Sequence, residues 1–421
     1  MSLTEVPLLF VLLGLTAYAV LGGADFGAGV WQLLSAGRRG HALREHAHRS
    51  MGPVWEANHV WLIFVLVIFW TAYPVAFGSI ASTLAVPLFI AAVGIILRGT
   101  AYALRSAARS DREATRIDLA FAMSSILTPF ALGTMVGAIA SGRVPVGNAT
   151  GDLWRSWLTP TAIFIGVLAV AAGAYMAAVF LAADARRIGR EDLAQSYRRR
   201  ALTAGSVAGA LALIGLVVMR ADARDLFDGL ITGPGIAALV ASAGAGLATL
   251  ALLSRSAFEP ARYVAAAAVA AIVGGWAVAQ QPMLLPGLTV HEAAAGRATL
   301  VAILVGVLAG SLVLIPSLAL LFRLVLRGAF DPRPKHHRAG AEPRRALTAP
   351  GAAWSRIVVT AAAVGTGLAL LGGGWREPLG IATLLAAAAV GSAGLVRLAL
   401  RDEPEVDDLD GTPPVAREPC A

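Results

Sequence analysis

Long apolar runs alternate with short polar segments along the whole chain. A run of roughly 18 to 25 apolar residues is long enough to cross a hydrocarbon core of about 30 Å as a helix. Eleven such runs cover residues 6–31, 54–73, 75–104, 118–142, 158–182, 201–219, 230–253, 260–280, 298–322, 357–374 and 378–396. An open sheet edge would leave backbone groups unpaired in lipid. The pattern therefore predicts an all-α integral membrane protein with about eleven transmembrane helices.

The polar segments divide the chain into four parts. Residues 1–330 hold nine of the predicted helices, and we expect them to form one transmembrane body. Residues 331–355 are rich in Pro and Arg, which favours a flexible cytoplasmic linker. Residues 356–400 add two helices whose apolar spans carry no charge. The acidic tail of residues 401–421 is expected to be disordered.

A short internal sequence repeat suggests how the nine-helix body is built. Ala17-Tyr18 precedes Asp25 in the first predicted helix, and Ala174-Tyr175 precedes Asp184 in the fifth. A repeat offset by four helices preserves orientation, so the nine-helix body could consist of two parallel four-helix bundles and a peripheral helix. A match this short and Ala-rich also arises by chance, and both explanations stay open.

Composition and charge agree with a membrane protein and fix an expected orientation. The chain is 57% hydrophobic and 14% charged, which leaves too few polar residues to cover a soluble globule of this size. When the loops are assigned alternately to two sides, one side receives 28 of the 34 Lys and Arg residues. By the positive-inside rule that side is cytoplasmic, so we expect the N-terminus outside and the C-terminus inside a bacterial cytoplasmic membrane. The net charge of +8 is then an orientation signal and does not indicate nucleic-acid binding.

Two simpler features limit the possible chemistry. The only cysteine is Cys420, so an internal disulfide, a Cys-ligated zinc ion or an iron–sulfur cluster cannot form within one chain. The first apolar run has no basic region before it and no small-residue cleavage site after it. It is therefore expected to be a retained helix rather than a signal peptide.

Charged residues inside predicted spans are the first candidates for function, because a charge in the bilayer costs several kcal/mol unless it is paired or hydrated. Asp25 lies in G-G-A-D-F-G-A-G, about two turns before the cytoplasmic end of the first predicted helix. Gly23 and Gly27 form a G-x-x-x-G pair that lets a neighbouring helix approach closely. We therefore expect Asp25 to face protein.

Three more charged residues lie at a similar depth. Glu56 sits one turn into the second predicted helix, Arg98 in the last third of the third, and Asp118 opens the fourth. Together with Asp25, they suggest a buried polar network near the cytoplasmic face that could relay protons, with Asn58 and His59 as polar neighbours. Alternatively, Arg98 and Asp118 are interfacial residues that snorkel or cap a helix.

Histidine positions restrict haem binding. His59 is the only one of the seven histidines within a predicted span, so a haem held by two histidines across a bundle cannot be built here. Counting does not exclude a haem with one His or a Met ligand. His59 lies three residues after Glu56 on the same helix face, which favours hydrogen bonding in the polar network over metal ligation. We expect this chain to bind no metal.

Two motifs carry a family resemblance. G-A-D-F-G-A-G is followed by G-P-V-W-E-A-N-H-V-W-L-I (residues 52–63), and the pair resembles the N-terminal signature of cytochrome bd oxidase subunit II. The resemblance continues weakly through L-R-G-T-A-Y-A-L-R-S (97–106), S-W-L-T-P (156–160) and L-L-P-G-L-T-V-H-E-A-A-A (284–295). It covers about residues 5–330.

The resemblance implies a role in a quinol oxidase. A chain of this family pairs with a homologous subunit I, which carries the b- and d-type haems, oxidises quinol and reduces O2 to water. Subunit II scaffolds that partner and contributes to cytoplasmic proton uptake, onto which Asp25 and Glu56 map. Members often have Asp at the position of Glu56, so its geometry can differ here. Members of the family have a body of nine helices, so the last two predicted helices of this chain depart from the family pattern. We expect a chain truncated after Phe330 to preserve turnover.

Two other classes of function stay open. A secondary transporter could use Asp25, Glu56 and Arg98 to bind a substrate or coupling ion. Transporter sites usually lie near the midplane, whereas these residues cluster toward one side, which favours the oxidase. The chain could also be a structural subunit of another membrane complex. A neighbouring gene for a haem-ligating partner would favour the oxidase.

Overall fold

The computed structural model describes residues 2–35, 37–105, 107–108, 110–326, 352–371 and 374–401. The predicted linker lies outside these residues except for its last four positions, and of the predicted acidic tail only Arg401 is described. The chain forms two compact units, Met1–Leu300 and Val301–Ala421, which are described separately.

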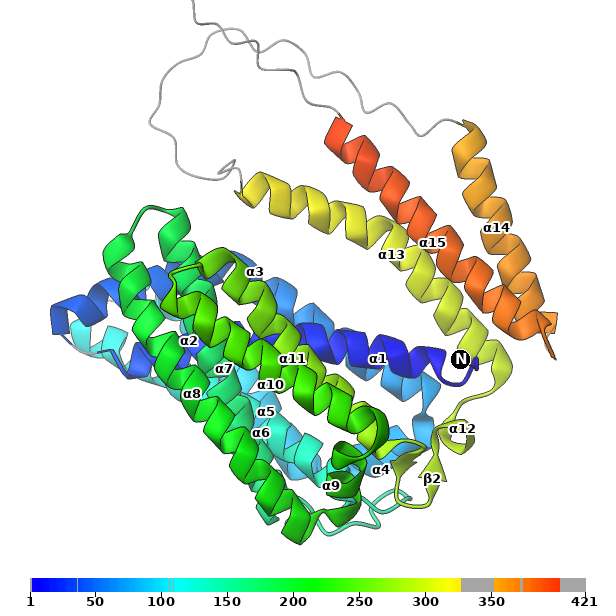
Figure 1. The fold of residues 1–421 in the computed structure, drawn as a ribbon, viewed down its shortest axis with the longest axis horizontal. Coiled ribbons are helices and arrows are strands. Elements are labelled where there is room, and N and C mark those ends of the chain that lie inside the picture. The colour runs from blue at the N-terminus through cyan, green and yellow to red at the C-terminus, as the bar shows by residue number, and fades with distance from the viewer. Residues whose placement is uncertain are drawn as a thin grey trace, which may run out of the picture. The chain divides into compact units, whose positions relative to one another are not determined.

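The first unit begins with helices that account for the first four predicted spans (Figure 1). They are α1 (Val6–Ala17), the π-helix η1 (Tyr18–Gly22), α2 (Gly23–Leu33), α3 (Gly37–Ala72), α4 (Pro74–Thr83), α5 (Ala85–Arg105) and α6 (Asp111–Ala140). The first three are consecutive and form a single span from Val6 to Leu33.

The remaining elements complete the first unit and make up the second. They are α7 (Pro160–Arg187), α8 (Glu191–Asp222), α9 (Arg224–Ile231), α10 (Gly233–Ser254), α11 (Phe258–Gln280), β1 (Met283–Leu285), β2 (Leu288–Thr289), α12 (Val290–Ala293), α13 (Arg297–Leu326), α14 (Ala352–Leu371) and α15 (Arg376–Arg401). The two strands pair in an antiparallel hairpin. The compact units divide inside α13.

The expectation of an all-α membrane protein is confirmed. Helical elements account for all eleven predicted spans, some of which contain more than one element. Eight helices within the described residues are long and apolar enough to cross a membrane, and two shorter apolar segments, Asn58–Ala72 and Ile357–Ala369, accompany them. The chain is therefore a multi-pass membrane protein.

Prolines explain two helix boundaries. Pro74 occupies the start of α4, directly after α3 ends at Ala72. The predicted span 75–104 is broken at Leu84 into α4 and α5. Pro87 explains this break, because its ring would clash with the carbonyl group of Thr83 in a continuous helix.

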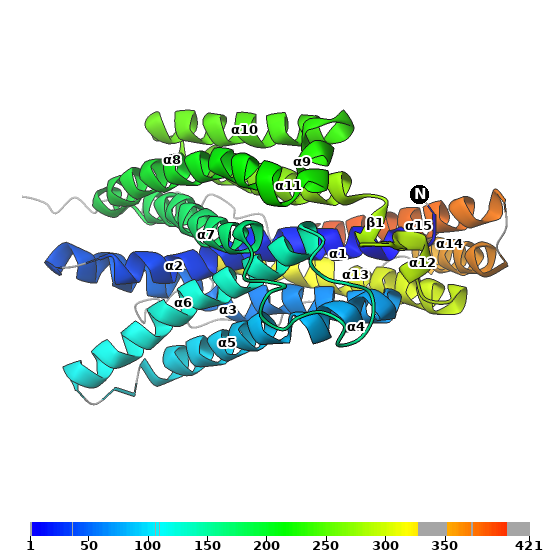
Figure 2. The same cartoon turned by 90° about the horizontal axis from the view of Figure 1, so that it is seen from below.

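In the first unit, α7 and the α1–α2 span lie between two groups of helices (Figure 2). On one side α7 packs against α8 and α11, and α10 packs against α11. On the other, α6 packs against α2, α5 and α7. The buried cluster around α7 is rich in alanine, whose small side chain lets helices approach closely. The interface between α2 and α7 thus joins the early and late helices.

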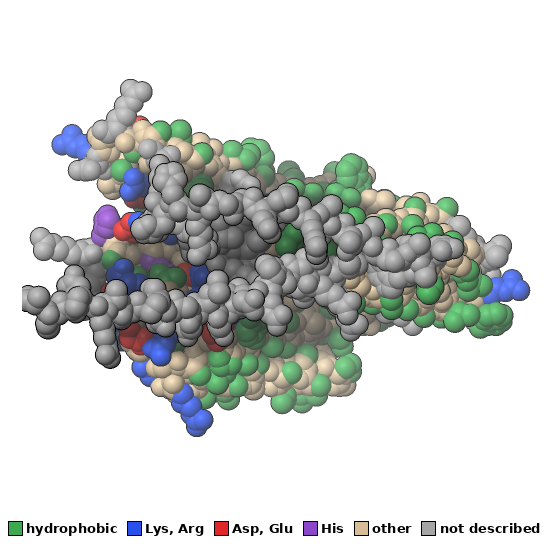
Figure 3. All heavy atoms as spheres, turned by 90° about the horizontal axis from the view of Figure 1, so that it is seen from above, with side chains coloured by type: hydrophobic (Ala, Val, Ile, Leu, Met, Phe, Trp, Pro, Cys, Tyr) green, Lys and Arg blue, Asp and Glu red, His purple; other side chains and the backbone are tan. Residues whose placement is uncertain are grey.

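Charged side chains are unevenly distributed on the surface. On the face drawn in Figure 3, most visible charged and histidine side chains gather at the left end, and hydrophobic side chains cover large areas elsewhere. This distribution is typical of a protein whose apolar flank faces lipid.

Within the second unit, α14 and α15 pack through glycines. A Cβ atom added to Gly380 would lie 2.5 Å from the backbone nitrogen of Ala369, and one added to Gly365 would lie 3.0 Å from the carbonyl oxygen of Gly380. Such close backbone contact is typical of helix pairs in lipid.

Candidate functional site

Asp25 is held at the crossing of α2 and α7. A Cβ atom added to Gly27 would lie 1.9 Å from the carbonyl oxygen of Gly173, and one added to Gly23 would lie 3.7 Å from Cα of Gly173. The G-x-x-x-G pair thus permits the close helix contact that the sequence predicted. Asp25 is fully buried. The π-helix directly before α2 is an element that often occurs at functional sites.

Arg98 of α5 is the partner of this buried carboxylate. Its Nη2 atom donates to Oδ1 of Asp25 at 2.6 Å and to the carbonyl oxygen of Asp25 at 2.9 Å. Its Nη1 atom donates to Oγ of Ser125 on α6. The side chain of Arg98 is 1% exposed, so both members of the ion pair are withdrawn from solvent.

Two aromatic rings complete the surroundings of the Arg98 guanidinium group. Its Cζ atom lies 4.2 Å from the ring centroid of Phe121 and 4.9 Å from that of Phe26. Cation–π contacts of this kind stabilise a desolvated guanidinium group by about 2 kcal/mol. Ser125, Phe121 and Phe26 were not identified from the sequence, because they carry no signal apart from their place on predicted helices.

Part of this site lacks hydrogen-bond partners. Oδ2 of Asp25, Nε of Arg98 and the hydroxyl group of Tyr18 are buried, and no described residue forms a hydrogen bond with any of them. A buried polar atom without a partner is costly, and at such a site an ordered water usually satisfies it. The second carboxylate oxygen of Asp25 is thus available to a water molecule or a proton.

A small cavity adjoins the ion pair. Its volume is about 10 Å³, close to the minimum that holds one water molecule. The cavity is lined by Asp25, Ala28, Gln32, Ala47, His48, Arg98, Tyr102 and Phe121. It therefore connects the buried carboxylate with polar side chains of α2, α3 and α5.

Two of the lining residues stack on each other: the ring centroids of His48 and Tyr102 are 4.8 Å apart. Burial lowers the pKa of His48 and the nearby Arg105 lowers it further, whereas Asp118 raises it. The ion pair between Arg105 and Asp118 spans 2.6 Å, and both side chains are about 40% exposed. Asp118 therefore lies near His48 and pairs with Arg105, whereas Arg98 pairs with Asp25.

Residues of the W-E-A-N-H segment lie on α3. Nδ2 of Asn58 donates to the carbonyl oxygen of Leu21 at 3.2 Å. The ring of His59 packs edge-on against Tyr18 and Phe26, at centroid distances of 6.4 and 6.1 Å. Both residues thus contact the η1–α2 segment. Glu56 lies on the same helix, but its side chain is outside the described part of the structure.

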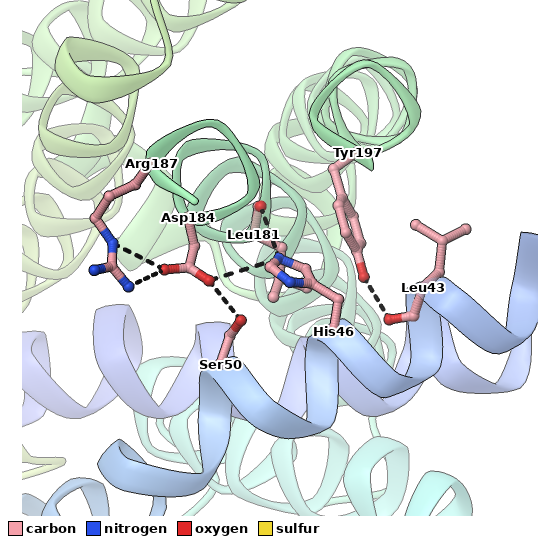
Figure 4. Close-up of polar contacts among 7 residues, drawn as sticks. All are labelled: Leu43, His46, Ser50, Leu181, Asp184, Arg187 and Tyr197. Carbon is pink, nitrogen blue, oxygen red and sulfur yellow. Dashed lines mark hydrogen bonds and ion pairs between the residues drawn. The ribbon is translucent and has the colours of Figure 1, made fainter. Parts of the chain in front are cut away.

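A second polar cluster joins α3 and α7 (Figure 4). Ser50 donates to Oδ2 of Asp184 at 2.6 Å, and Arg187 donates to Oδ1 at 2.8 Å. Nε2 of His46 lies 3.6 Å from Asp184 Oδ2 and 3.4 Å from the carbonyl oxygen of Leu181. His46 is 6% exposed and Asp184 24%, so this cluster is nearer the surface than the pair of Asp25 and Arg98. The sequence singled out Asp184 only as part of a repeat.

The fold and this site define a class: a multi-pass helical membrane protein with a buried ion pair near one end of its helices. The sequence matches the model of the family described as cytochrome bd terminal oxidase subunit II over residues 3–325. The chain therefore belongs to this family.

Two relatives from Bacillus subtilis (strain 168) are similar to parts of the chain. One, a putative cytochrome bd menaquinol oxidase subunit II, is 23% identical over 217 residues, which are 51% of this chain and 62% of the relative. The other, a cytochrome bd ubiquinol oxidase subunit 2, is 25% identical over 143 residues, which are 34% of this chain and 41% of the relative. The chain thus spans less than two thirds of the length of either relative.

A solved structure gives broader coverage. A chain from the structure of bd oxidase from Geobacillus thermodenitrificans is 25% identical, with a TM-score of 0.66. The similarity covers 79% of this chain and 100% of that chain. The helical fold and the family assignment thus agree.

Proposed function

We propose that this chain is the non-haem subunit of a cytochrome bd-type quinol oxidase. It pairs with a haem-bearing subunit I, which oxidises quinol and reduces O2 to water, and it scaffolds that partner in the membrane. The family match over residues 3–325 supports this assignment. The two relatives are named for different quinols, so the proposal extends to quinol as a class.

The histidines support placing the haems in the partner. His46 packs against Tyr197 and faces Asp184, His48 stacks on Tyr102, and His59 contacts the edges of two aromatic rings. Each of these three rings thus has neighbours of its own within the described part of the structure. We assign the b- and d-type haems to subunit I, as the family resemblance implies, and the role of this chain is to bind that subunit and to move protons.

The observation that carries the proton role is the buried carboxylate of Asp25, whose Oδ2 lacks a partner among the described residues beside a cavity for one water molecule. Reduction of one O2 consumes four electrons and four protons and yields two water molecules. Oδ2 can accept a proton from that water while Oδ1 keeps its contact with Arg98. His48 and Gln32 also line the cavity; His48 would supply the water with protons, and the amide group of Gln32 would orient it.

The outer end of this route is the half-exposed ion pair of Arg105 and Asp118. The excess of basic residues on this side supports a cytoplasmic position, with the N-terminus outside and the C-terminus inside. Glu56 is proposed as a further proton carrier on α3, two residues before Asn58 and three before His59 on the same helix. Protons would thus enter from the cytoplasm and reach the partner through this chain.

The cavity also argues against the transporter alternative. A space of about 10 Å³ admits one water molecule and excludes larger substrates. The two charged groups that a transporter would offer to a substrate are already bound to each other. The oxidase subunit is therefore the function that the geometry supports best.

The assignment can be tested by co-expression with the haem-bearing subunit encoded in the same genome. We expect a complex that contains both chains, consumes oxygen when a quinol is added and shows haem in a reduced-minus-oxidised spectrum. The same chain purified without its partner is expected to show no haem absorbance. A stoichiometric haem signal from this chain alone, or a complex without quinol-dependent oxygen uptake, would contradict the proposal.

A further inference from the structure

A basic hollow lies beside α8, away from the buried ion pair. Its volume is about 390 Å³, and it is lined by Trp31, Gly40, Leu43, Ser196, Arg199, Arg200 and Thr203. Three helices, α2, α3 and α8, contribute to it. Its inner wall is fixed, because the hydroxyl group of Tyr197 on α8 donates to the carbonyl oxygen of Leu43 on α3 at 2.7 Å (Figure 4).

The two arginines of this hollow differ from three arginines at the end of α7 and in the connection to α8. Arg186, Arg187 and Arg190 each form an ion pair with a carboxylate. Arg199 and Arg200 form none within the described part of the chain. Two adjacent guanidinium groups without a counter-charge favour the binding of an anion.

Arg200 is held in place at the edge of the hollow. Its Nη1 atom donates to the carbonyl oxygen of Ser196 at 3.2 Å. Its Cζ atom lies 5.8 Å from the ring of Trp31 and 6.0 Å from that of Tyr197. Trp31 lies near the end of the first span, at a depth where tryptophan meets lipid headgroups. The charge of Arg200 therefore sits at the boundary between apolar and polar membrane layers.

The surface of α8 below the hollow is apolar. Val207, Ile214 and Val217 are 49%, 52% and 70% exposed. At 3.6 residues per turn they lie on nearly the same helix face as Arg199 and Thr203. A basic end and an apolar stripe thus follow each other along one side of α8. A phospholipid has the same arrangement, with an anionic phosphate above an acyl chain.

We propose that this hollow binds the phosphate headgroup of an anionic phospholipid, with an acyl chain along Val207, Ile214 and Val217. Arg199 and Arg200 contact the phosphate. The hydroxyl groups of Ser196 and Thr203 donate to backbone carbonyl oxygens of α8, so their own oxygens can accept from hydroxyl groups of the headgroup. Basic pockets between transmembrane helices bind anionic headgroups by this combination of charge and depth. The site is independent of the proton route and does not require the oxidase assignment.

The test uses the full chain in its complex with the partner, in detergent. Native mass spectrometry would follow binding of phosphatidylglycerol and of phosphatidylcholine, both with palmitoyl and oleoyl chains. We expect the complex to prefer phosphatidylglycerol. The Arg199→Gln, Arg200→Gln variant should weaken its binding by about tenfold or more, since each basic group near a membrane surface contributes about 1 kcal/mol.

Two controls separate charge at this site from general effects. The Arg186→Gln, Arg190→Gln variant removes the same charge from ion-paired arginines and should leave the preference unchanged. Arg199→Gln alone removes only an exposed side chain, so it keeps the test usable if the double variant does not assemble. It should weaken phosphatidylglycerol binding by several-fold.

A third arm distinguishes a lipid from a free anion. Inorganic phosphate at high concentration should displace little phosphatidylglycerol, because it lacks the acyl chain that packs on α8. Full displacement of phosphatidylglycerol by inorganic phosphate would show that the hollow binds a free anion, and it would overturn the proposal. The proposal would also be overturned if the wild type, the Arg199→Gln, Arg200→Gln variant and the Arg199→Gln variant showed the same lipid preference. A partner subunit that covers the hollow in the complex would overturn it as well.

Discussion

Two carboxylates, Asp25 and Asp184, follow an Ala-Tyr pair on neighbouring helices, yet their surroundings differ. Asp25 is fully buried and bound to the equally buried Arg98. Asp184 is 24% exposed and accepts hydrogen bonds from Ser50 and from the half-exposed Arg187. The charge of Asp25 is balanced by one ionic partner, whereas the charge of Asp184 is stabilised by several partners and by solvent.

Helix geometry explains the difference. Asp184 lies nine residues after Tyr175 in the regular helix α7, and therefore on roughly the opposite face. Asp25 lies seven residues after Tyr18, across the π-helix η1, and also close to the contact with Gly173. Asp184 is three residues from the end of α7, where solvent reaches it. A similar sequence thus gives one buried pair and one surface cluster.

The largest expected effect is the loss of Arg98. In Arg98→Gln the buried carboxylate of Asp25 loses its counter-charge, and we expect the complex to be destabilised by about 3–5 kcal/mol. The matched change at the second cluster is Arg187→Gln, which should cost less than about 1 kcal/mol because that pair is hydrated. Thermal unfolding and the yield of assembled complex would measure both.

A double variant sharpens this prediction. Asp25→Asn combined with Arg98→Gln removes both charges, so it should restore much of the assembly that either single variant loses. Equal losses in Arg98→Gln and Arg187→Gln would show that burial does not distinguish the two clusters.

The second effect concerns the crossing of α2 and α7. In Gly27→Ala the new methyl group would lie 1.9 Å from the carbonyl oxygen of Gly173, so the helices must separate. We expect a destabilisation of about 1–3 kcal/mol and a weaker contact between Asp25 and Arg98. Gly209→Ala on α8 is the control, because its new Cβ would meet nothing within 4 Å. A Gly27→Ala complex as stable as that control would contradict the close contact.

The third effect is on turnover. His48→Phe keeps an aromatic ring against Tyr102 but removes the titratable group beside the cavity, and Gln32→Leu removes its amide. If protons pass through this cavity, each variant should assemble normally and reduce oxygen at least about tenfold more slowly. His46→Phe at the second cluster should change turnover much less. Oxygen uptake with added quinol, normalised to haem content, would measure all three.

Glu56 offers a separate test of the relay. Glu56→Gln keeps the size and hydrogen-bonding capacity of the side chain but removes its proton, and Glu56→Asp retains the acid. We expect the first to slow oxygen reduction and the second to retain most activity. Unchanged turnover in Glu56→Gln, His48→Phe and Gln32→Leu would exclude the proton route through this chain.

Much of this comparison could be predicted from the sequence, because membrane depth follows from position along an apolar run. The position of Asp25 and Arg98 within apolar runs marked them as candidates, and both are buried. The G-x-x-x-G pair predicted the close packing at Gly23 and Gly27. Contacts between distant helices could not be predicted in this way, because they depend on how the helices pack. The cavity beside His48 and the pairing of Asp118 with Arg105 follow from the packing of α3, α5 and α6. Pro87 in α5 indicates the helix break at Leu84, which the hydropathy pattern alone did not predict.

The smallest expected effect is the pH dependence contributed by His46. Burial lowers the pKa of His46; Asp184 and the carbonyl group of Leu181 raise it, and Arg190 and Arg187 lower it again. Tyr197 packs on the ring as a neutral neighbour. Because burial dominates, the folded state binds fewer protons than the unfolded chain near the usual histidine pKa of about 6.5. The contribution to stability is therefore present above about pH 6.5 and is lost as the pH falls below it.

The matched variants are His46→Gln and His41→Gln. Glutamine at position 46 can still donate to Asp184 or to Leu181 but does not titrate, so the loss of stability between about pH 7.5 and about pH 5.5 should shrink by about 1 kcal/mol. His41 lies on the same helix and is exposed, so His41→Gln should keep the wild-type slope. Thermal unfolding of the assembled complex at both pH values gives the comparison. If His46→Gln loses as much stability as the wild type between the two pH values, His46 binds protons equally in the folded and unfolded chain, and the prediction is wrong.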